Sequence, residues 1–366
     1  MINDNKIILI TGGAGFIGTN LAKHFLEQGR TVRILDNLSR EGVDKNLDWL
    51  VNNFKDKVQV VIGDVTNEKV VDKAITGASK VFHFAAQVAV TTSLIDPIND
   101  FEVNVGGTLN VLESIRNNGK IESLVYTSTN KVYGNLDDVM LTSNHTTRYN
   151  PVSNTLKKRG IDESRPLDFH SPYGCSKGSA DQYILNYYRS YNIPSVVFRM
   201  SCIYGPHQFG TEDQGWVAHF VIRALQGKTI TLYGDGKQVR DILFVEDLVN
   251  AFDLASSNIS RTAGKVFNMG GGVNNTVSLI EILNKIKGIT NKEINIIYED
   301  WRVGDQKYYV SNTNKFNSLT NWAPQYNVDD GLTALINWQV ENNPNIKIKE
   351  KEIHLSENKI KNKAVA

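Results

Sequence analysis

The stretch Ile7-Ile8-Leu9-Ile10-Thr11 runs directly into Gly12-Gly13-Ala14-Gly15-Phe16-Ile17-Gly18, and an amphipathic stretch over 17–28 follows. The apolar run predicts a short buried strand, and the amphipathic stretch predicts a helix. Between them, the first spaced glycine permits a tight turn, the second lets backbone approach a pyrophosphate, and the third lets the helix pack on the strand. The order strand, glycine turn, helix predicts a dinucleotide-binding site with its phosphates at the helix N-terminus.

The first 200 residues alternate short apolar runs with helical patterns. We expect strands over 7–11, 31–36, 58–63, 80–85, 123–128 and 196–200, and helices over 17–28, 105–116 and 176–189. Strands rich in Val and Ile, separated by amphipathic stretches, indicate a parallel sheet covered on both faces. The predicted fold is therefore α/β, a Rossmann doubly wound parallel sheet, which binds its ligand beyond the carboxyl ends of the strands.

The alternation fades after about Tyr204. Helical patterns over 216–225, 247–256, 279–286 and 330–341 mix there with strand-like pieces at 229–232 and 295–298. We interpret them as a smaller mixed α/β C-terminal substrate lobe. The predicted division is a Rossmann domain at 1–203 with a returning segment at about 237–262, a substrate-binding lobe mainly at 204–341, and a polar tail at 342–366 that is solvated or frayed.

Composition narrows the function classes. The 366 residues carry a formal net charge of +1, without the basic surplus that nucleic-acid binding favours. No apolar run reaches the ~18–20 residues of a membrane helix, and the first residues lack a signal-peptide pattern. The two cysteines, Cys175 and Cys202, form neither a disulfide framework nor a metal-binding CxxC pattern. We expect a cytoplasmic protein that binds no nucleic acid, no membrane and no metal.

Asp36 ends the second predicted strand, near the offset expected for an acid that binds the ribose of a dinucleotide. A carboxylate there accepts hydrogen bonds from the ribose hydroxyls and repels a 2′-phosphate, which favours NAD over NADP. Two alternatives stay open. Arg40 lies nearby and could accommodate a phosphate, and Asp36 could instead be a helix cap.

Two further strand ends are compatible with a cofactor site. Asp64-Val65 follows the third strand, where an adenine edge could be read. Phe84-Ala85-Ala86-Gln87 follows the fourth strand, where small residues let backbone lie near the cofactor. Neither signal identifies a site without the glycine turn.

Tyr173 and Lys177 open a predicted helix four residues apart, so they share one helical face. An ammonium near a phenol, along with a positive nicotinamide ring, lowers the phenol pKa from its usual value of about 10. The phenolate can then take a proton from a substrate hydroxyl while hydride leaves the same carbon. Thr129 or Ser128, at the end of the fifth strand, can hydrogen-bond the reacting oxygen. These residues predict an alcohol-oxidising site.

The joint pattern resembles the extended short-chain dehydrogenase/reductase family, which includes nucleotide-sugar epimerases and dehydratases, over residues 6 to 340. The residues that carry the resemblance are Gly12–Gly18, Asp36, Phe84–Gln87, Asn104, Thr129, Tyr173 and Lys177. It implies that Thr129 contacts the substrate, that Tyr173 is the base and that Lys177 binds the cofactor ribose. It also implies that Asn37 and Asn104 contact NAD.

The two residues after Thr129 bear on the reaction. The 4,6-dehydratases of this family carry Asp-Glu there, an acid and a base that expel water from the sugar. This chain has Asn130-Lys131, which cannot serve as such a pair. The resemblance therefore implies oxidation followed by re-reduction from the other face, which is epimerisation.

Within that family, several stretches resemble the CDP-tyvelose 2-epimerases, also called CDP-paratose 2-epimerases. They are 128–134, 168–177, 181–183, 213–216, 236–241 and 302–306. This resemblance implies a CDP-sugar inverted at C2, NAD retained between turnovers, and a role in lipopolysaccharide O-antigen biosynthesis. Arg240 and Arg302 suit the pyrophosphate, although each could be a solvated surface residue.

Several other side chains have two interpretations. By family position, Gln87 and Gln208 contact the sugar. Trp216 either forms part of the wall of the nucleotide pocket or packs in the core. His170 is expected to order its loop and Cys175 to pack as a small apolar residue, with contact to the substrate as the alternative for each.

Two other functions fit part of the pattern. A UDP-sugar 4-epimerase would share the fold and the catalytic residues. A non-catalytic NAD-binding protein would keep the glycine turn but would not need Thr129, Tyr173 and Lys177 together. The apolar faces of helices 105–116 and 176–189 suit a homo-oligomer, either a dimer or a tetramer, although internal packing would give the same pattern.

Overall fold

The computed structural model describes residues 6–118, 120–143 and 146–343. Its centre is a seven-stranded sheet in the order β12-β8-β5-β4-β1-β2-β3, in which each neighbouring pair is parallel. The strands are β1 (Ile7–Thr11), β2 (Thr31–Asp36), β3 (Val58–Ile62), β4 (Ala78–His83), β5 (Ser123–Thr129), β8 (Ser195–Met200) and β12 (Val266–Met269). The predicted doubly wound α/β fold is confirmed.

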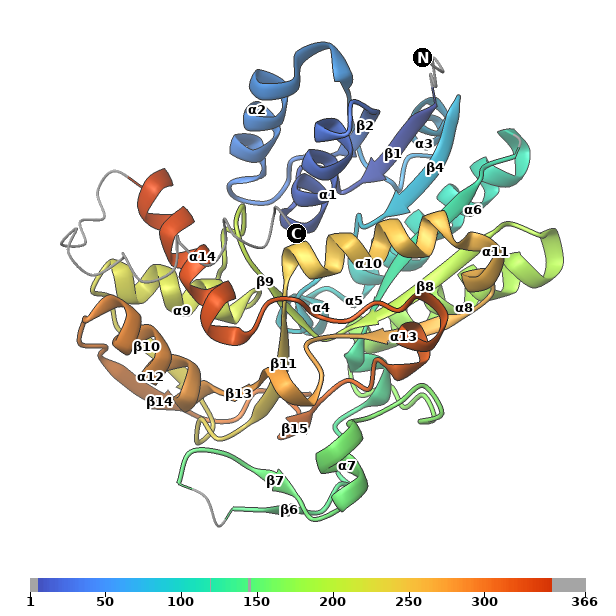
Figure 1. Cartoon of the computed structure of the whole chain (residues 1–366). Helices are drawn as coiled ribbons and strands as arrows, with labels where there is room; N and C mark the ends of the chain where they lie inside the picture. The colour runs from blue at the N-terminus through green and yellow to red at the C-terminus, as the bar shows by residue number, and fades with distance from the viewer. Residues whose placement is uncertain (1–5, 119, 144–145, 344–366) are drawn as a thin grey trace.

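Helices cover both faces of this sheet (Figure 1). One face packs against α1 (Phe16–Glu27), α2 (Val43–Phe54) and α10 (Val245–Ser257). The other packs against α3 (Glu68–Ile75), α6 (Gly107–Asn118) and α8 (Pro172–Tyr191). Strand order reverses between β1 and β4, so the ligand crevice of this fold lies beyond the carboxyl ends of these two strands.

A second group of elements lies at the lower left of Figure 1. Its apolar core joins α9 (Trp216–Leu225), α12 (Leu279–Thr290) and α14 (Val328–Asn342) to β10 (Ile230–Tyr233). The exposed strand β14 (Ile296–Glu299) pairs with β10 in parallel. The small sheet around β11 (Val239–Phe244) contains β9 (Cys202–Tyr204), β13 (Thr276–Ser278) and β15 (Tyr308–Tyr309). The mixed C-terminal part is thus as expected, while the domain boundaries stay a prediction.

Short elements complete the described chain. They are α4 (Val90–Ile95), α5 (Pro97–Phe101), α7 (Asn154–Arg159), α11 (Ile259–Thr262), α13 (Asn314–Thr320), the 3₁₀ turns η1 (Lys55–Lys57), η3 (Asn130–Tyr133) and η4 (Val273–Asn275), the π-helix η2 (Glu102–Gly106), and the pair β6 (Leu141–Thr142) and β7 (Asn150–Pro151). None of the described helices is long and apolar enough to cross a membrane. The predicted tail beyond residue 343 lies outside the described residues.

The segment between β5 and α8 carries β6, β7 and α7 and contacts the C-terminal part. The backbone N–H of Tyr149 donates to the Lys237 carbonyl at 3.0 Å. Arg148 pairs with Glu281, with Nε donating to Oε1 at 2.7 Å. Glu281 also completes a capping box with Ser278 at the start of α12. These contacts anchor the loop that leads to Tyr173.

Candidate active site

The glycine turn after β1 has the backbone geometry that its residues predict. Gly12 has φ +66°, and a Cβ atom there would lie 2.8 Å from the backbone nitrogen of Ala85. A Cβ atom at Gly18 would lie 2.3 Å from the Gly12 carbonyl oxygen, so the third glycine packs on the turn itself rather than on the strand. Gly15 is the N-cap of α1 and provides no side-chain cap. Helix α1 therefore begins without a side-chain cap. The N–H groups of its first residues, Phe16 and Ile17, suit the binding of a diphosphate.

Asp36 ties the end of β2 to this turn. Its Oδ2 accepts a hydrogen bond of 3.0 Å from the Ala14 N–H, and its Oδ1 accepts one of 2.9 Å from the Leu38 N–H. It caps no helix, because α2 begins at Val43 after the N-cap Gly42. Burial raises the pKa of Asp36 above its usual value, and these backbone hydrogen bonds only partly oppose that shift. Each oxygen retains a lone pair that a ribose hydroxyl could use.

The loops after β2, β3 and β4 meet the turn. Asn37 Nδ2 donates to Asp64 Oδ2 at 2.6 Å. Burial raises the pKa of Asp64, but hydrogen bonds from Thr66 and Asn37 outweigh it and leave that pKa lowered. Val65 is buried, and the Ala85 N–H donates to the Thr11 hydroxyl at 3.2 Å. Ala86 follows in the same partly buried loop.

Asn104 and Gln87 make internal hydrogen bonds. Asn104 is buried in η2, and its Oδ1 accepts from the Gln87 N–H at 2.9 Å. The Gln87 side chain folds back on its own loop, donating to the Ala89 carbonyl at 2.9 Å and accepting from the Ala89 N–H at 3.0 Å. Both residues thus fix the conformation of the loop after β4.

Thr129, Ser128 and Tyr173 converge at the end of β5. The Thr129 hydroxyl accepts from the Lys131 N–H at 3.2 Å and lies close enough to the Tyr173 phenol to lower its pKa. The Ser128 hydroxyl is buried and has no partner among the described residues. Ser171 caps α8 by accepting from the Gly174 N–H at 3.0 Å, which places Tyr173 in the first helical turn.

Burial dominates the pKa values of Tyr173 and Lys177. Burial raises the pKa of Tyr173 to about 12, while Thr129 and Arg40 lower it. Burial has the opposite effect on the cationic Lys177 and lowers its pKa to about 7. The Lys177 Nζ lies 4.4 Å from the centre of the Tyr126 ring. The predicted lowering of the phenol pKa includes the charge of a bound nicotinamide ring and stays a prediction; among the protein groups alone, desolvation of the phenolate outweighs the positive charge of Arg40.

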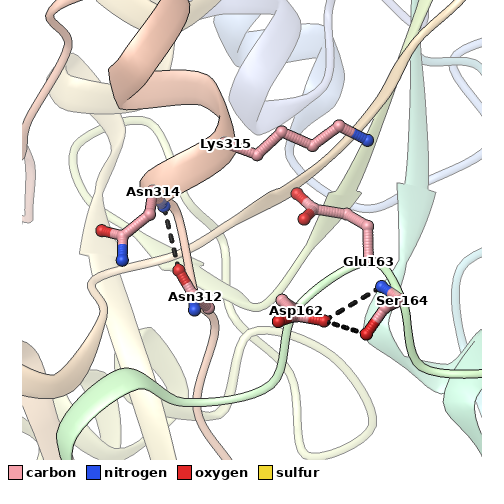
Figure 2. Close-up of a pocket in the computed structure, with 6 residues that line it drawn as sticks. All are labelled: Asp162, Glu163, Ser164, Asn312, Asn314 and Lys315. Carbon is pink, nitrogen blue, oxygen red and sulfur yellow. Dashed lines mark hydrogen bonds between the residues drawn. The ribbon is translucent and has the colours of Figure 1, made fainter.

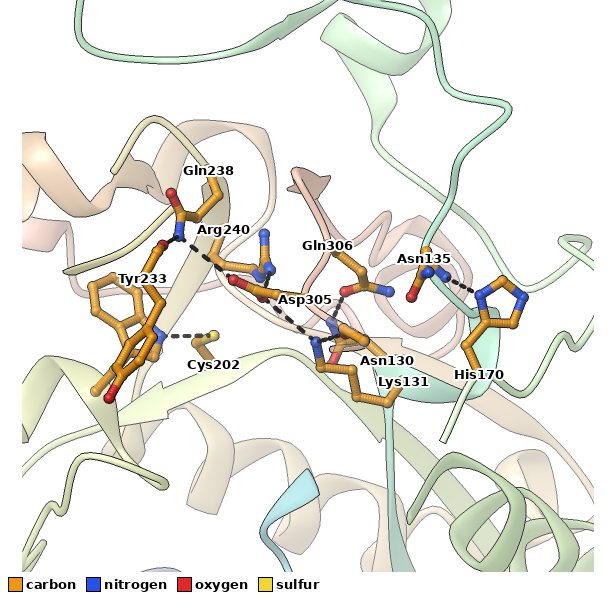
Figure 3. Close-up of polar contacts among 12 residues, drawn as sticks. Asn130, Lys131, Asn135, His170, Cys202, Tyr233, Gln238, Arg240, Asp305 and Gln306 are labelled. Atoms are coloured by element: carbon orange, nitrogen blue, oxygen red, sulfur yellow. Dashed lines mark hydrogen bonds and ion pairs between the residues drawn. The ribbon is translucent and has the colours of Figure 1, made fainter. Parts of the chain in front are cut away.

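Lys131 and Arg240 share the carboxylate of Asp305 (Figure 3). Arg240 Nη2 donates to Asp305 Oδ1 at 2.7 Å, and Lys131 Nζ lies 3.8 Å from the same oxygen. Lys131 also donates to the Gly304 carbonyl at 2.9 Å. Arg240 is therefore a buried, paired residue, and its alternative as a solvated surface side chain is wrong. The cluster carries two positive charges against one negative charge.

The other expected substrate residues lie in the C-terminal part. Arg302 stacks 3.8 Å from the centre of the Tyr233 ring and donates to the Glu212 carbonyl at 3.1 Å. Trp216 is half-buried at the start of α9, and its Nε1 donates to the Cys202 thiol at 3.2 Å. Gln208 is buried, and its Oε1 has no partner among the described residues.

The two residues that flank Tyr173 differ in outcome. His170 Nδ1 accepts from the Asn135 N–H at 3.2 Å, and its Nε2 lies 2.8 Å from Asp168 Oδ2. These contacts join two loops, as predicted for His170. Cys175 is exposed on α8, so the prediction that it packs as an apolar residue is wrong. Its neighbours Gly174 and Ser176 face inward instead.

A polar surface hollow lies beside β12, apart from these residues (Figure 2). It is lined by Asp162, Glu163, Ser164, Asn312, Asn314 and Lys315. Several of these groups already bind protein atoms: Glu163 accepts from the Asn268 N–H, and Lys315 donates to the Val266 carbonyl. No predicted site residue lines the hollow. Within the described ranges, no cluster of three or more His, Cys, Asp or Glu could hold a metal ion.

Two contributors to the site were not among the predicted site residues. Ser93, in α4, accepts a hydrogen bond of 3.1 Å from the Tyr173 N–H. Gln306 is buried, accepts from Asn130 Nδ2 at 2.9 Å and donates to the Gly134 carbonyl at 2.6 Å. Gln306 fell within a stretch that carried the resemblance, but Ser93 could be found only from the packing of α4 on α8.

Comparison with known proteins agrees with this geometry. The model of the NAD dependent epimerase/dehydratase family matches residues 8–270. The chain is 43% identical over 340 residues to CDP-paratose 2-epimerase of Salmonella typhi, covering 90% of this chain and 98% of that protein. UDP-glucose 4-epimerase of Thermus thermophilus, solved with NAD, superposes with a TM-score of 0.75 at 29% identity, over 91% of this chain and 98% of that one. The corresponding enzyme of Thermotoga maritima, solved with UDP-glucose, gives 0.77 at 27%, over 92% and 99%.

Proposed function

Because the chain belongs to the NAD dependent epimerase/dehydratase family, we propose that it interconverts CDP-paratose and CDP-tyvelose by inverting C2 of the sugar. The observation that carries this proposal is the 43% identity to a CDP-paratose 2-epimerase over nearly the full length of both proteins. The junction of Thr129, Tyr173 and Lys177 at the carboxyl edge of the sheet supports it. A binding protein without catalysis would not need that junction.

The residues present are suited to NAD. The uncapped α1 N-terminus offers N–H groups to a diphosphate, and Asp36 offers acceptors to a ribose. We propose that the cofactor is bound by Gly12, Gly15, Phe16, Ile17, Gly18, Asp36, Asn37, Asp64, Val65, Ala85, Ala86, Gln87, Asn104, Tyr173 and Lys177. When bound, NAD would supply the hydride acceptor and donor that oxidation and re-reduction at C2 require.

Tyr173 performs the proton transfer in this proposal. Its phenolate accepts the proton of the C2 hydroxyl as the 2-keto sugar forms, and the phenol returns a proton to that oxygen after the sugar has turned. Thr129 donates a hydrogen bond to the same oxygen and orients it. Lys177 binds the ribose and supplies positive charge beside Tyr173.

Turning the sugar requires a firmly held nucleotide and a loosely held ring. The net positive charge of the Lys131–Asp305–Arg240 cluster suits the diphosphate, with Arg302 as a further contact. We assign the unpartnered Ser128 hydroxyl and the Gln208 amide oxygen to sugar hydroxyls. We also assign Gln87 to the sugar and Trp216 to the wall of the nucleotide pocket.

The proposal also covers the oligomeric state of the enzyme, its division into lobes and its location in the cell. The apolar residues of the predicted helix 105–116 pack in the core instead of at a subunit contact, as Val111, Leu112 and Ile115 of α6 do. Exposed apolar side chains on α4, α5 and α8 suit a homo-oligomer, either a dimer or a tetramer; they include Ile95, Ile98, Phe101 and Tyr183. The lobes of the proposed domain division, 1–203 and 204–341, enclose the substrate between them. We place the enzyme in the cytoplasm, with its product used for lipopolysaccharide O-antigen.

Incubation of the purified protein with CDP-paratose, CDP-tyvelose and UDP-glucose, followed by NMR of the sugar ring, tests the assignment. The two CDP-sugars should interconvert at C2, with UDP-glucose unchanged. A UDP-sugar 4-epimerase, suggested by a putative UDP-glucose 4-epimerase at 31% identity, would instead produce UDP-galactose. Turnover of UDP-glucose without turnover of the CDP-sugars would overturn the proposal.

A further inference from the structure

Asp100 is a buried carboxylate to which the proposed mechanism gives no role. It lies in α5 and is 1% exposed. Its Oδ1 accepts a hydrogen bond of 3.2 Å from Asn104 Nδ2. Its Oδ2 has no hydrogen bond of normal geometry among the described residues, although the Ser176 hydroxyl is close enough to lower the pKa that burial raises. A buried carboxylate with a free oxygen calls for a charged partner.

Hydrogen bonds connect Asp100 to the helix turn that carries the catalytic pair. Asn104 Nδ2 donates to Ser176 Oγ at 2.9 Å as well as to Asp100. Ser176 Oγ in turn donates to the Tyr173 carbonyl at 3.2 Å. Asp100 is therefore held beside the turn of α8 between Tyr173 and Lys177.

Lys177 lacks a matched counter-charge. Its ammonium is buried and makes no hydrogen bond to another described residue, apart from its contact with the Tyr126 ring. Two carboxylates, Asp181 and Asp100, raise its pKa. Asp181 is bound by Arg199 through two hydrogen bonds of 2.7 and 3.2 Å, so its charge is already paired. Asp100 forms no ion pair with any cation in the described ranges.

We propose that Asp100 is the counter-ion of Lys177 and a positioning residue for the Tyr173–Lys177 pair. Its charge holds Lys177 as an ammonium and opposes ionisation of Tyr173, so it sets the pH range of the reaction. The proposal rests on the proposed function, because it assigns the electrostatics of that same site.

The other charged groups around the pair do not change their charge near neutral pH. His83, on β4, is kept neutral because burial and then the charge of Lys177 lower its pKa to about 3. Tyr126, on β5, is kept neutral because burial raises its pKa well above 10. Arg40 and Arg199 stay positive, and Asp181 is paired. Tyr173 and Lys177 remain as the groups whose protonation Asp100 can tune.

Asp100→Asn tests the proposal, because the amide keeps the shape and the contact with Asn104 but removes the charge. Without that charge both Lys177 and Tyr173 lose their protons at lower pH. The profile of kcat/KM against pH should move to lower pH on both limbs, by about 0.5–1 unit. A merely structural defect would lower activity at every pH without moving the limbs. Glu102→Gln, an exposed acid two residues further on, should leave the profile in place.

Binding of NAD, measured by calorimetry across the same pH range, gives a readout without turnover. Affinity should fall where Lys177 loses its proton, and this fall should come at lower pH in Asp100→Asn. Failure of the sugar assignment would leave this shift intact, so the two proposals fail separately. If Asp100→Asn does not fold, Asp100→Ser must give the same shift. Unmoved profiles and an unmoved binding curve in a folded variant would overturn the role of Asp100.

Discussion

Arg240 Nη2 lies 2.7 Å from Oδ1 of Asp305, and Lys131 Nζ lies 3.8 Å from the same atom. The side chains of Arg240, Asp305 and Lys131 are only 7%, 24% and 21% exposed. Since η3 begins directly after Thr129 and carries Lys131, the arrangement brings unbalanced positive charge next to the catalytic strand end. A diphosphate would supply the missing negative charge.

Asp305→Asn should lower the free energy of unfolding by about 1–3 kcal/mol, because Arg240 and Lys131 would then face each other without a counter-charge. Urea denaturation measures this loss. Asp329→Asn, which breaks the exposed contact with Lys285, should change stability by less than about 1 kcal/mol. Equal effects of the two substitutions would contradict the role given to Asp305.

Tyr173→Phe should lower kcat by at least about 10²–10⁴-fold, the usual contribution of a positioned acid–base group. NAD should remain bound, since the glycine turn and Asp36 are untouched. Steady-state rates and the cofactor content of the purified protein measure both quantities. Tyr183→Phe, on the exposed side of the same helix, should retain full activity. Normal turnover by the Tyr173 variant would remove the assigned base.

Gly18→Ala should abolish NAD binding or folding, because the added methyl would meet the Gly12 carbonyl at 2.3 Å. Gly288→Ala, in α12 with open space around it, should instead stabilise the protein by about 0.5–1 kcal/mol. Fluorescence titration with NAD and thermal unfolding distinguish the two outcomes. Normal NAD affinity in the Gly18→Ala variant would show that the turn is less tightly packed than described.

His83 predicts how stability depends on pH. Burial, and then the charge of Lys177, lowers its folded-state pKa to about 3, whereas the unfolded chain has the ordinary value of about 6.5. Between these values the unfolded state binds more protons, so stability falls as pH falls. Replacing His83 with Gln should therefore make the loss of unfolding free energy between pH 7 and pH 5 smaller by about 2 kcal/mol. Urea denaturation at the two pH values measures this. An equal loss of unfolding free energy in the wild-type protein and the variant would contradict the role of His83.

Ile98→Asp should shift the protein toward the monomer, because Ile98 is 71% exposed on the apolar surface assigned to self-association. Size-exclusion chromatography with light scattering measures the mass. Ile297→Asp, at a 48% exposed position on β14, serves as the matched control and should leave the mass unchanged. A wild-type protein that is already monomeric would contradict the proposed assembly.

The elements that sequence could predict are those set by local patterns. Helix α9 was predicted with its observed bounds, and β1, β2 and the glycine turn followed from periodicity and spacing. The short strand β12 was missed because its neighbour β8 lies far away in sequence, and only tertiary pairing makes Val266–Met269 a strand. The π-helix η2 interrupts the predicted helix 105–116 for a similar reason, since Asn104 bonds to Gln87 in the loop after β4 and to Ser176 in α8.

The residues of the candidate site divide in the same way, into those that local motifs predict and those that only the tertiary structure brings together. Gly12, Asp36 and Tyr173 could be named because motif spacing reports local geometry. The burial of Asp100, the contact of Ser93 with Tyr173 and the pairing of Arg240 with Asp305 depend on segments far apart in the chain. The burial that raises the pKa of Tyr173 was not predicted, because a sequence gives the neighbouring charges but not the depth of burial.

Deuterium at C2 of CDP-paratose tests the central claim most directly. The account requires hydride to leave C2, stay within the enzyme and return to the same carbon on its other face. NMR and mass spectrometry of the CDP-tyvelose formed in ordinary water should therefore find the deuterium still on C2. Its replacement by solvent hydrogen at each turnover would mean that C2 loses a proton, and would contradict the oxidation of the sugar alcohol at Tyr173.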